Sequence, residues 1–222
     1  MLTTRVGDAS DAAAAGRLWT AANLARTAAL EHDPRSAAVD RSALDDGPAA
    51  TDRSALDDGT PAVDRSALDD GSVQGDAPPP GGPAAGVSEQ VAHAVAEARV
   101  RRMLTAPGSL IVLAEQDGDP VAMALIVQAL AQDGASADPL PGVTHVTMVA
   151  VHPAHWRRGL GGAVVTRAEA EARRLGYTRA QLWTQQSNER AHHLYTGLGW
   201  ILSGRSKTDD HGEQIRHYTR DL

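Results

Sequence analysis

Residues 149–162 read Val149-Ala-Val-His-Pro-Ala-His-Trp-Arg-Arg-Gly-Leu-Gly-Gly162 and form the most informative stretch of the chain. An apolar strand leads into a proline-containing turn, and the glycines that follow two arginines open a helix. The first N–H groups of a helix have no acceptor within it, and glycine allows a bulky anion to approach them. Arg157 and Arg158 add charge suited to phosphate. The stretch therefore predicts a site for a pyrophosphate-containing ligand. The alternative is a tight strand-to-helix turn with two solvated arginines.

Two common phosphate-binding loops do not fit this turn. It lacks the Gly-Lys-Ser/Thr ending of a Walker A loop. Val164 stands where a Rossmann loop has its third glycine, and no acidic residue ends the following strand. The ligand is therefore predicted to be neither a nucleoside triphosphate nor a dinucleotide bound in the usual way.

The segments on both sides of the turn predict alternating strands and helices. Ser10 or Asp11 is the expected cap of the first helix, and Ser88 caps a helix that carries Val91 and Val95. The alternation in the second half predicts parallel pairing of strands 143–151 and 180–184, and hence an α/β or α+β fold with a mixed sheet. The other expected strands are 3–8, 110–116, 121–130, 200–208 and 214–221, and the helices are 10–31, 88–106, 159–175 and 188–198.

An acidic repeat interrupts this pattern. The octet Asp-Arg-Ser-Ala-Leu-Asp-Asp-Gly occurs at 40–47, 52–59 and 64–71, and residues 33–86 carry 11 Asp and 4 Arg. Each repeat offers one large apolar side chain, which is too little to offset the entropy of ordering twelve residues. The Asp spacing matches no common calcium loop. We therefore predict a disordered insertion at 33–87 within a single domain made of 1–32 and 88–222.

The composition excludes several classes of protein. Outside 33–86 the chain holds 17 acidic and 17 basic residues, so it offers no net positive charge for nucleic acid. It has no cysteine, no visible secretory signal and no apolar run long enough for a membrane span. Metal-ligand spacing is suggested by His152, His155, His192 and His193, but the turn has no nearby carboxylate ligand, so no metal is expected. These features predict a soluble, cytoplasmic protein that binds neither nucleic acid nor membranes.

Two motifs resemble the GCN5-related N-acetyltransferase (GNAT) family. The first is Arg158-Gly159-Leu160-Gly161 with Val151-His-Pro153 upstream, although Trp156 stands where the family usually has Arg or Gln. The second is Asn188-x-x-Ala191-x-x-x-Tyr195-x-x-x-Gly199-Trp200. They occur in the family's order, with one helix and one strand between them. The resemblance covers 3–31 and 88–222.

The resemblance implies acetyl-CoA as cosubstrate. A bulge would splay the strand at 143–151 from the next parallel strand, and the acyl-CoA would lie in the gap. Asn188 would cap its own helix and contact the CoA arm. Backbone groups of Val149, Ala150 and Val151 would hold the pantetheine, and N–H groups of Arg157, Arg158, Gly159, Leu160, Gly161 and Gly162 would hold the pyrophosphate.

The resemblance also implies two catalytic groups. Tyr195 matches the general acid near the sulfur, and the alternative is a core tyrosine. His145 suits the general base and is expected on the same strand face as Thr147 and Val149. Alternatively, the His145 side chain only forms a hydrogen bond with a neighbouring backbone group, or an ordered water acts as the base in its place.

The expected function is transfer of acetyl from acetyl-CoA to a primary amine of a small molecule or protein. A homodimer is left open. One alternative is a catalytically silent acyl-CoA-binding or interaction module. Another is that the acidic repeats act as a flexible tether to a basic partner, which truncation of 35–83 would test.

Overall fold

The computed structural model describes residues 1–31, 88–134, 136–209 and 212–222. The chain forms two compact units, Met1–Ala28 with Pro79–Leu222, and Ala29–Pro78. The second unit lies almost entirely outside the described residues, and so does the predicted insertion at 33–87. The first unit holds the fold described below.

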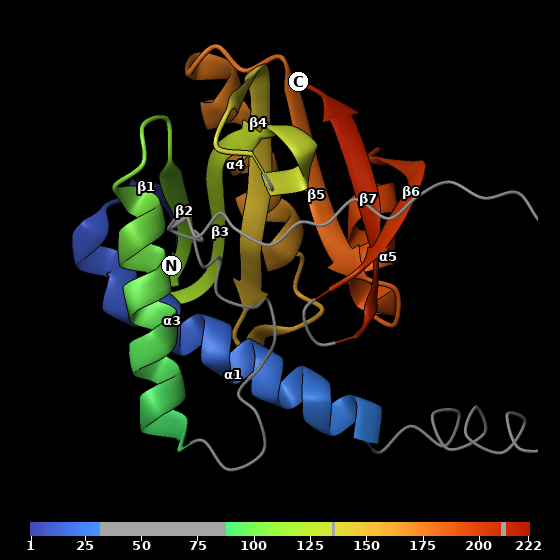
Figure 1. Cartoon of the computed structure of the whole chain (residues 1–222). Coiled ribbons are helices and arrows are strands. Elements are labelled where there is room, and N and C mark those ends of the chain that lie inside the picture. The colour runs from blue at the N-terminus through green and yellow to red at the C-terminus, as the bar shows by residue number, and fades with distance from the viewer. Residues whose placement is uncertain (32–87, 135, 210–211) are drawn as a thin grey trace, which may run out of the picture. The chain divides into compact units, whose positions relative to one another are not determined.

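The described residues of the first unit form a seven-stranded mixed sheet (Figure 1). The strand order is β1-β2-β3-β4-β5-β7-β6, and all neighbours are antiparallel except the parallel pair β4 and β5. The predicted mixed sheet and its parallel pair are therefore confirmed. The strands are β1 (Leu2–Gly7), β2 (Leu110–Gln116), β3 (Asp119–Leu130), β4 (Pro139–Val151), β5 (Arg179–Gln185), β6 (Ile201–Thr208) and β7 (Gln214–Asp221).

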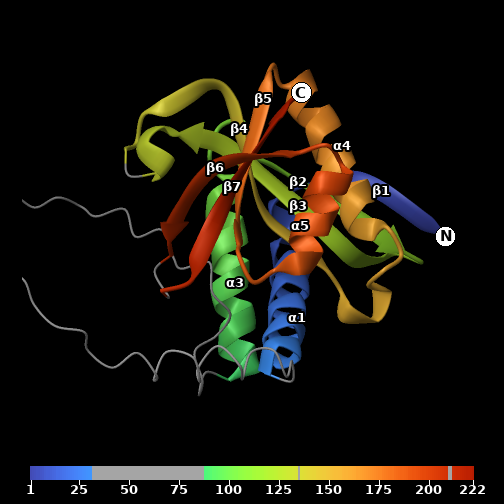
Figure 2. The same cartoon turned by 90° about the vertical axis from the view of Figure 1, so that its right-hand side faces the viewer.

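Helices cover both faces of this sheet. Helices α1 (Ala12–Glu31) and α3 (Glu89–Leu104) pack on one face, and α4 (Leu160–Arg174) and α5 (Glu189–Gly197) on the other. Figure 2 shows α4 and α5 on the side of the sheet away from α1 and α3. None of the described helices has the length and apolar character that a membrane span requires.

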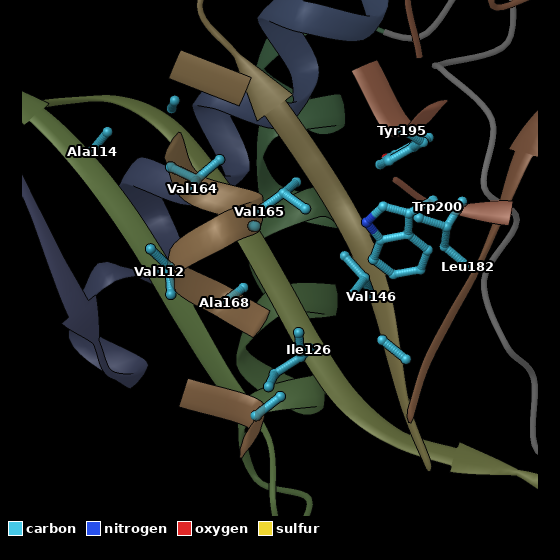
Figure 3. Packing of buried hydrophobic residues seen from close by; sticks show 14 of the residues in the cluster. Val112, Ala114, Ile126, Val146, Val164, Val165, Ala168, Leu182, Tyr195 and Trp200 are labelled. Atoms are coloured by element: carbon cyan, nitrogen blue, oxygen red, sulfur yellow. The ribbon is translucent and has the colours of Figure 1, made fainter. Parts of the chain in front are cut away.

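The larger core lies between the sheet and α4. Apolar residues recur on one side of α4 at helical spacing, and this side faces β2, β3 and β4. Because the chain has no Phe, aliphatic side chains fill most of this core. Figure 3 shows Val164, Val165 and Ala168 of α4 beside Val112, Ile126 and Val146 of the strands.

The helix starts follow local capping signals. Ser88 caps α3 as predicted, since its side chain accepts a hydrogen bond from the Val91 N–H. The prediction for the first helix was wrong. Asp8 is the cap of the short 3-10 turn that leads into α1, and Asp11 bonds back to the Asp8 N–H in a capping box.

The buried side of α3 consists of small residues rather than the valines near its start. Ala92, Ala96 and Val100 are buried, whereas Val91 and Val95 are 51% and 57% exposed. The buried residues recur every four positions, as expected for one face of a helix. Small residues on both helices allow α3 to approach α1 closely. A Cβ at Gly16 of α1 would lie only 2.7 Å from the Glu97 nitrogen of α3.

A bulge interrupts strand β4 at Met148, which has a positive φ of 43°. Leu125 pairs with Thr147 and Met123 pairs with Ala150, so two residues of β4 oppose Ala124 alone. The extra residue reverses the alternation of faces along the strand. Before the bulge, Val146 faces α4; after it, Val149 and Val151 face α4 instead.

This bulge corrects one sequence prediction. His145 alternates with Val146 and therefore lies on the face of α1 and α3, whereas Val149 packs in the core with α4. His145 and Val149 consequently do not share a face. The prediction assumed strict alternation, which the bulge breaks.

Strands β4 and β5 separate soon after they begin to pair. Their register runs only from Val143 opposite Arg179 to His145 opposite Gln181. Beyond this point β4 continues to Val151 while β5 stays paired with β7 as far as Gln185. The splayed pair is thus present, and the edge of β4 from residue 146 onward faces a gap in the ladder.

Candidate active site

The turn after β4 is held in place by Trp156. Its indole N–H donates a hydrogen bond of 2.8 Å to the Val151 carbonyl at the end of the strand. The guanidinium of Arg190, on α5, lies 4.4 Å above the centre of the Trp156 ring. Trp156 therefore connects the turn to the end of β4 and to α5. The residue that departs from the family pattern thus has a structural role.

The turn presents a run of backbone donors. Within the described part of the chain, the N–H groups of residues 157–162 donate no hydrogen bond, and the first bonded one is Ala163 to the Gly159 carbonyl at 3.0 Å. Arg157 and Gly159 both have positive φ, 64° and 77°. Left-handed residues in a turn can direct successive N–H groups toward one anion. The exposed arginines Arg157 and Arg158 add positive charge beside it.

Glycines in this turn serve two different purposes. A Cβ on Gly159 would meet open space, so its positive φ is what requires glycine. A Cβ on Gly161 would lie 3.3 Å from the Leu194 Cδ2 and 3.6 Å from the Val151 Cγ2. Gly161 therefore allows α4 to pack closely on α5 and β4.

Tyr195 projects from α5 into the core beside the end of β4. Its side chain is 6% exposed and packs in the same cluster as Val149 and Val151. The rings of Trp200 and Tyr218 lie 5.8 Å and 6.0 Å away. Burial raises the pKa of the Tyr195 hydroxyl, which stays protonated at neutral pH. With no hydrogen bond to a described residue, this hydroxyl keeps its proton available for another acceptor.

His145 and Tyr195 lie on opposite faces of the sheet. His145 is the last residue of β4 that pairs with β5, at the point where the gap opens, and it faces the side of α1 and α3. Tyr195 faces the side of α4 and α5. The structure therefore brings both residues to the splayed strands, but from the two sides of the gap.

Asn188 caps α5 as the sequence predicted. Its Oδ1 accepts a hydrogen bond of 3.1 Å from the Ala191 N–H. This capping role accounts for the residue by itself, and its contact with a coenzyme stays a prediction.

The sequence reasoning missed Glu169, which supports Tyr195. Glu169 is 3% exposed, and its carboxylate accepts a hydrogen bond of 2.9 Å from the Trp200 indole and lies 3.2 Å from the Arg220 Nε. Trp200 in turn packs against Tyr195. The signal that could have indicated it is the apolar side of the helix 159–175, where a charged residue requires a buried partner.

His192, which the sequence marked only by metal-ligand spacing, has a structural role. Its Nδ1 lies 2.8 Å from the Tyr218 hydroxyl and its Nε2 lies 3.1 Å from the Gln186 carbonyl, so it connects α5 to β7.

Across the described residues, no three His, Cys, Asp or Glu side chains gather in a group that could hold a metal ion.

The sheet has one splayed parallel pair, and the turn that follows β4 has N–H groups without hydrogen bonds to described residues. This is the arrangement of an acetyltransferase fold. Residues 84–200 match the model of the acetyltransferase (GNAT) family, and the chain belongs to this family. No curated protein sequence is similar enough to the chain to count as a match.

Solved structures support the same fold. yncA, a putative acetyltransferase from Salmonella typhimurium solved with its cofactor acetyl-CoA, is 18% identical with a TM-score of 0.55, covering 100% of this chain and 94% of its own. An N-acetyltransferase from Staphylococcus aureus Mu50 is 14% identical with a TM-score of 0.54, covering 100% and 98%. The PaiA N-acetyltransferase from Thermoplasma acidophilum, solved with coenzyme A, is 8% identical with a TM-score of 0.52, covering 100% and 99%.

Proposed function

We propose that this protein is a cytoplasmic, acetyl-CoA-dependent N-acetyltransferase that acts on a primary amine of a small molecule or protein. The observation that carries the proposal is the run of N–H groups at residues 157–162 that donate no hydrogen bond to a described residue, after the end of β4. Membership of the acetyltransferase family supports it.

The residues of the turn fit the pyrophosphate of acetyl-CoA. The N–H groups of residues 157–162 and the charges of Arg157 and Arg158 would hold this anion at the start of α4. On the open edge of β4, backbone groups of Val149, Ala150 and Val151 would bind the amide-containing pantetheine arm as an added strand would be bound. The bulge at Met148 orients this edge.

When bound, acetyl-CoA supplies an activated acetyl thioester. In the transfer, a C–N bond forms between amine and acetyl carbon while the C–S bond breaks. His145 would accept the proton of the amine, directly or through a water, and Tyr195 would donate its Oη proton to the sulfur. The products are an N-acetyl amide and the free thiol of CoA, and solvent would carry the proton from His145 back to the Tyr195 oxygen, which restores both groups.

The positions of Tyr195 and His145 are consistent with the proposed roles of acid and base. The Tyr195 hydroxyl is protonated at neutral pH and lies on the side of α4, where the proposed pyrophosphate site begins. His145 lies on the other face, and the amine would approach the gap from that face. In the proposed reaction, Tyr195 and His145 therefore act from opposite sides of the gap between β4 and β5.

The test is release of CoA thiol from acetyl-CoA in the presence of a panel of amines, with the melting temperature measured in parallel. An enzyme releases thiol in proportion to amine. A silent acyl-CoA-binding module would be stabilised by acetyl-CoA, by about 2.7 kcal/mol at a hundredfold excess over Kd, without releasing thiol. A protein that shows neither effect would overturn the proposal.

A further inference from the structure

Arg190 places a positive charge beside the turn at residues 156–161. Its guanidinium carbon lies 4.4 Å from the centre of the Trp156 ring. Leu194, one helical turn further along α5, is the side chain that a Cβ on Gly161 would meet at 3.3 Å. Because residues four positions apart share one face of a helix, Arg190 and Leu194 lie on the face of α5 that meets the start of α4. Figure 2 shows α5 beside α4.

The charge of Arg190 is not neutralised by a carboxylate of the described residues. Arg190 is exposed and forms no ion pair with a described residue. Glu189 is its neighbour in sequence, but consecutive residues of a helix do not face each other. Residues 139–168, which include the turn and the start of α4, contain neither Asp nor Glu. Together with the two arginines of the turn, Arg190 therefore makes this region positive.

The position of Arg190 within α5 is unfavourable for the helix itself. Helix α5 begins at Glu189, so Arg190 lies in its first turn. The first turn of a helix carries a partial positive charge, which favours acidic side chains there and disfavours basic ones. An anion bound beside Arg190 would offset this repulsion. A ligand therefore explains the location of this charge better than the stability of α5 does.

Trp156 holds the Arg190 side chain next to the turn. The hydrogen bond from its indole N–H to the Val151 carbonyl fixes the ring at the end of β4. A guanidinium that already lies on a fixed ring loses less freedom when it binds an anion. The next residues along the chain are 157–162, whose N–H groups donate no hydrogen bond to a described residue. An anion held by these N–H groups would therefore lie near the Arg190 guanidinium.

We propose that Arg190, supported by Trp156, binds the pyrophosphate of acetyl-CoA from the side of α5. This inference rests on the proposed N-acetyltransferase function. The planar guanidinium would donate hydrogen bonds to the phosphate oxygens. Residue 156 then supplies no charge of its own, although the family usually has Arg or Gln at this position. Its ring instead supports a charge that comes from another helix.

The experiment measures the dissociation constants of CoA and of 3′-dephospho-CoA by calorimetry, which requires no turnover. 3′-Dephospho-CoA keeps the pyrophosphate and lacks only the phosphate on the ribose. Loss of a charged hydrogen bond to a phosphate predicts about tenfold weaker binding of both ligands in Arg190→Met. Arg190→Lys keeps the charge and should lose less affinity. A loss seen with CoA but not with 3′-dephospho-CoA would assign Arg190 to the ribose phosphate and overturn the proposed contact.

A double-mutant cycle tests the support that Trp156 gives. Trp156→Leu should weaken CoA binding more in the wild-type background than in the Arg190→Met background. The strength of a cation–π contact at an exposed site limits this difference to about two- to fivefold. Loss of the hydrogen bond to Val151 affects both backgrounds, so the comparison isolates the contact with Arg190. Equal effects in the two backgrounds would overturn the supporting role of Trp156.

Unfolding in urea separates a binding role of Arg190 from a purely structural one. A binding role predicts weaker CoA binding in Arg190→Met with little change in the urea midpoint, because the first turn of α5 gains nothing from a cation. A lower midpoint with an unchanged dissociation constant would overturn the proposal. Arg173→Met is the matched control, since it removes an exposed positive charge at the far end of α4 and should change neither quantity.

Failure of this inference can be distinguished from failure of the proposed function. A wild type that binds CoA and releases thiol, with equal affinity for CoA in Arg190→Met, would overturn the Arg190 contact alone. A wild type that binds neither CoA nor 3′-dephospho-CoA would overturn both.

Discussion

Replacing Tyr195 by phenylalanine removes one oxygen atom from the centre of the candidate site. The ring would remain between Trp200 and Tyr218, so the packing of α5 is preserved. The hydroxyl forms no hydrogen bond with a described residue, so its removal leaves no described partner unsatisfied. The substitution therefore isolates the proton that Tyr195 would donate.

The structure sets the expected size of two effects. A positioned general acid contributes on the order of 10²–10⁴ to a rate, so kcat should fall within this range. The free energy of unfolding should change by less than about 0.5 kcal/mol, because no hydrogen bond is lost. The dissociation constant of acetyl-CoA should stay near its wild-type value. A large kinetic effect should thus accompany a small effect on stability.

The assay is thiol release at saturating acetyl-CoA and amine, with urea unfolding of the same preparations. Tyr218→Phe is the matched control, since it removes a hydroxyl from a ring 6.0 Å away that bonds to His192 at 2.8 Å. It should lower stability by about 1 kcal/mol and leave kcat within a small factor of the wild type. Full activity of Tyr195→Phe would refute the assignment of Tyr195 as the acid.

Four further outcomes are expected. Arg157→Gly suits the positive φ of 64° and removes the charge, so it should weaken acetyl-CoA binding by about three- to tenfold in calorimetry; unchanged affinity would exclude a side-chain contact. His145→Ala should lower kcat/KM and remove the acidic limb of its pH profile, and a persisting limb would assign that limb to another group. Glu169→Gln should lower the free energy of unfolding by about 1–2 kcal/mol in urea, because Arg220 loses its carboxylate; equal stability would show that the pair contributes nothing. Deleting residues 35–83, predicted from sequence to be dispensable, should leave thiol release intact, and loss of cooperative unfolding would contradict that prediction.

Much of the fold could be predicted because its signals are local. Ser88 and Asn188 each accept a hydrogen bond from a residue three positions further on, so their roles depend only on neighbouring sequence. The glycine-rich turn likewise requires a positive φ at Gly159, and glycine is the residue that tolerates it. The cap of the first helix was misplaced because Asp8, Ser10 and Asp11 are all capping residues within four positions. Only the fold shows that Asp8 and Asp11 bond reciprocally.

The bulge in β4 could not be predicted in this way, and it determines which strand residues face α4. Met148 adopts its positive φ within an apolar run that contains neither glycine nor asparagine, so no residue type marks the position. What defines it is the pairing with β3, where Ala124 stands opposite two residues, and such pairing depends on sequence more than twenty positions away. Strict alternation would have placed His145 and Val149, the proposed base and a proposed coenzyme contact, on one face of the sheet. One inserted residue instead turns Val149 toward α4 and leaves His145 on the other face. In the proposed reaction, the amine and the thioester would therefore approach the gap from opposite faces of the sheet.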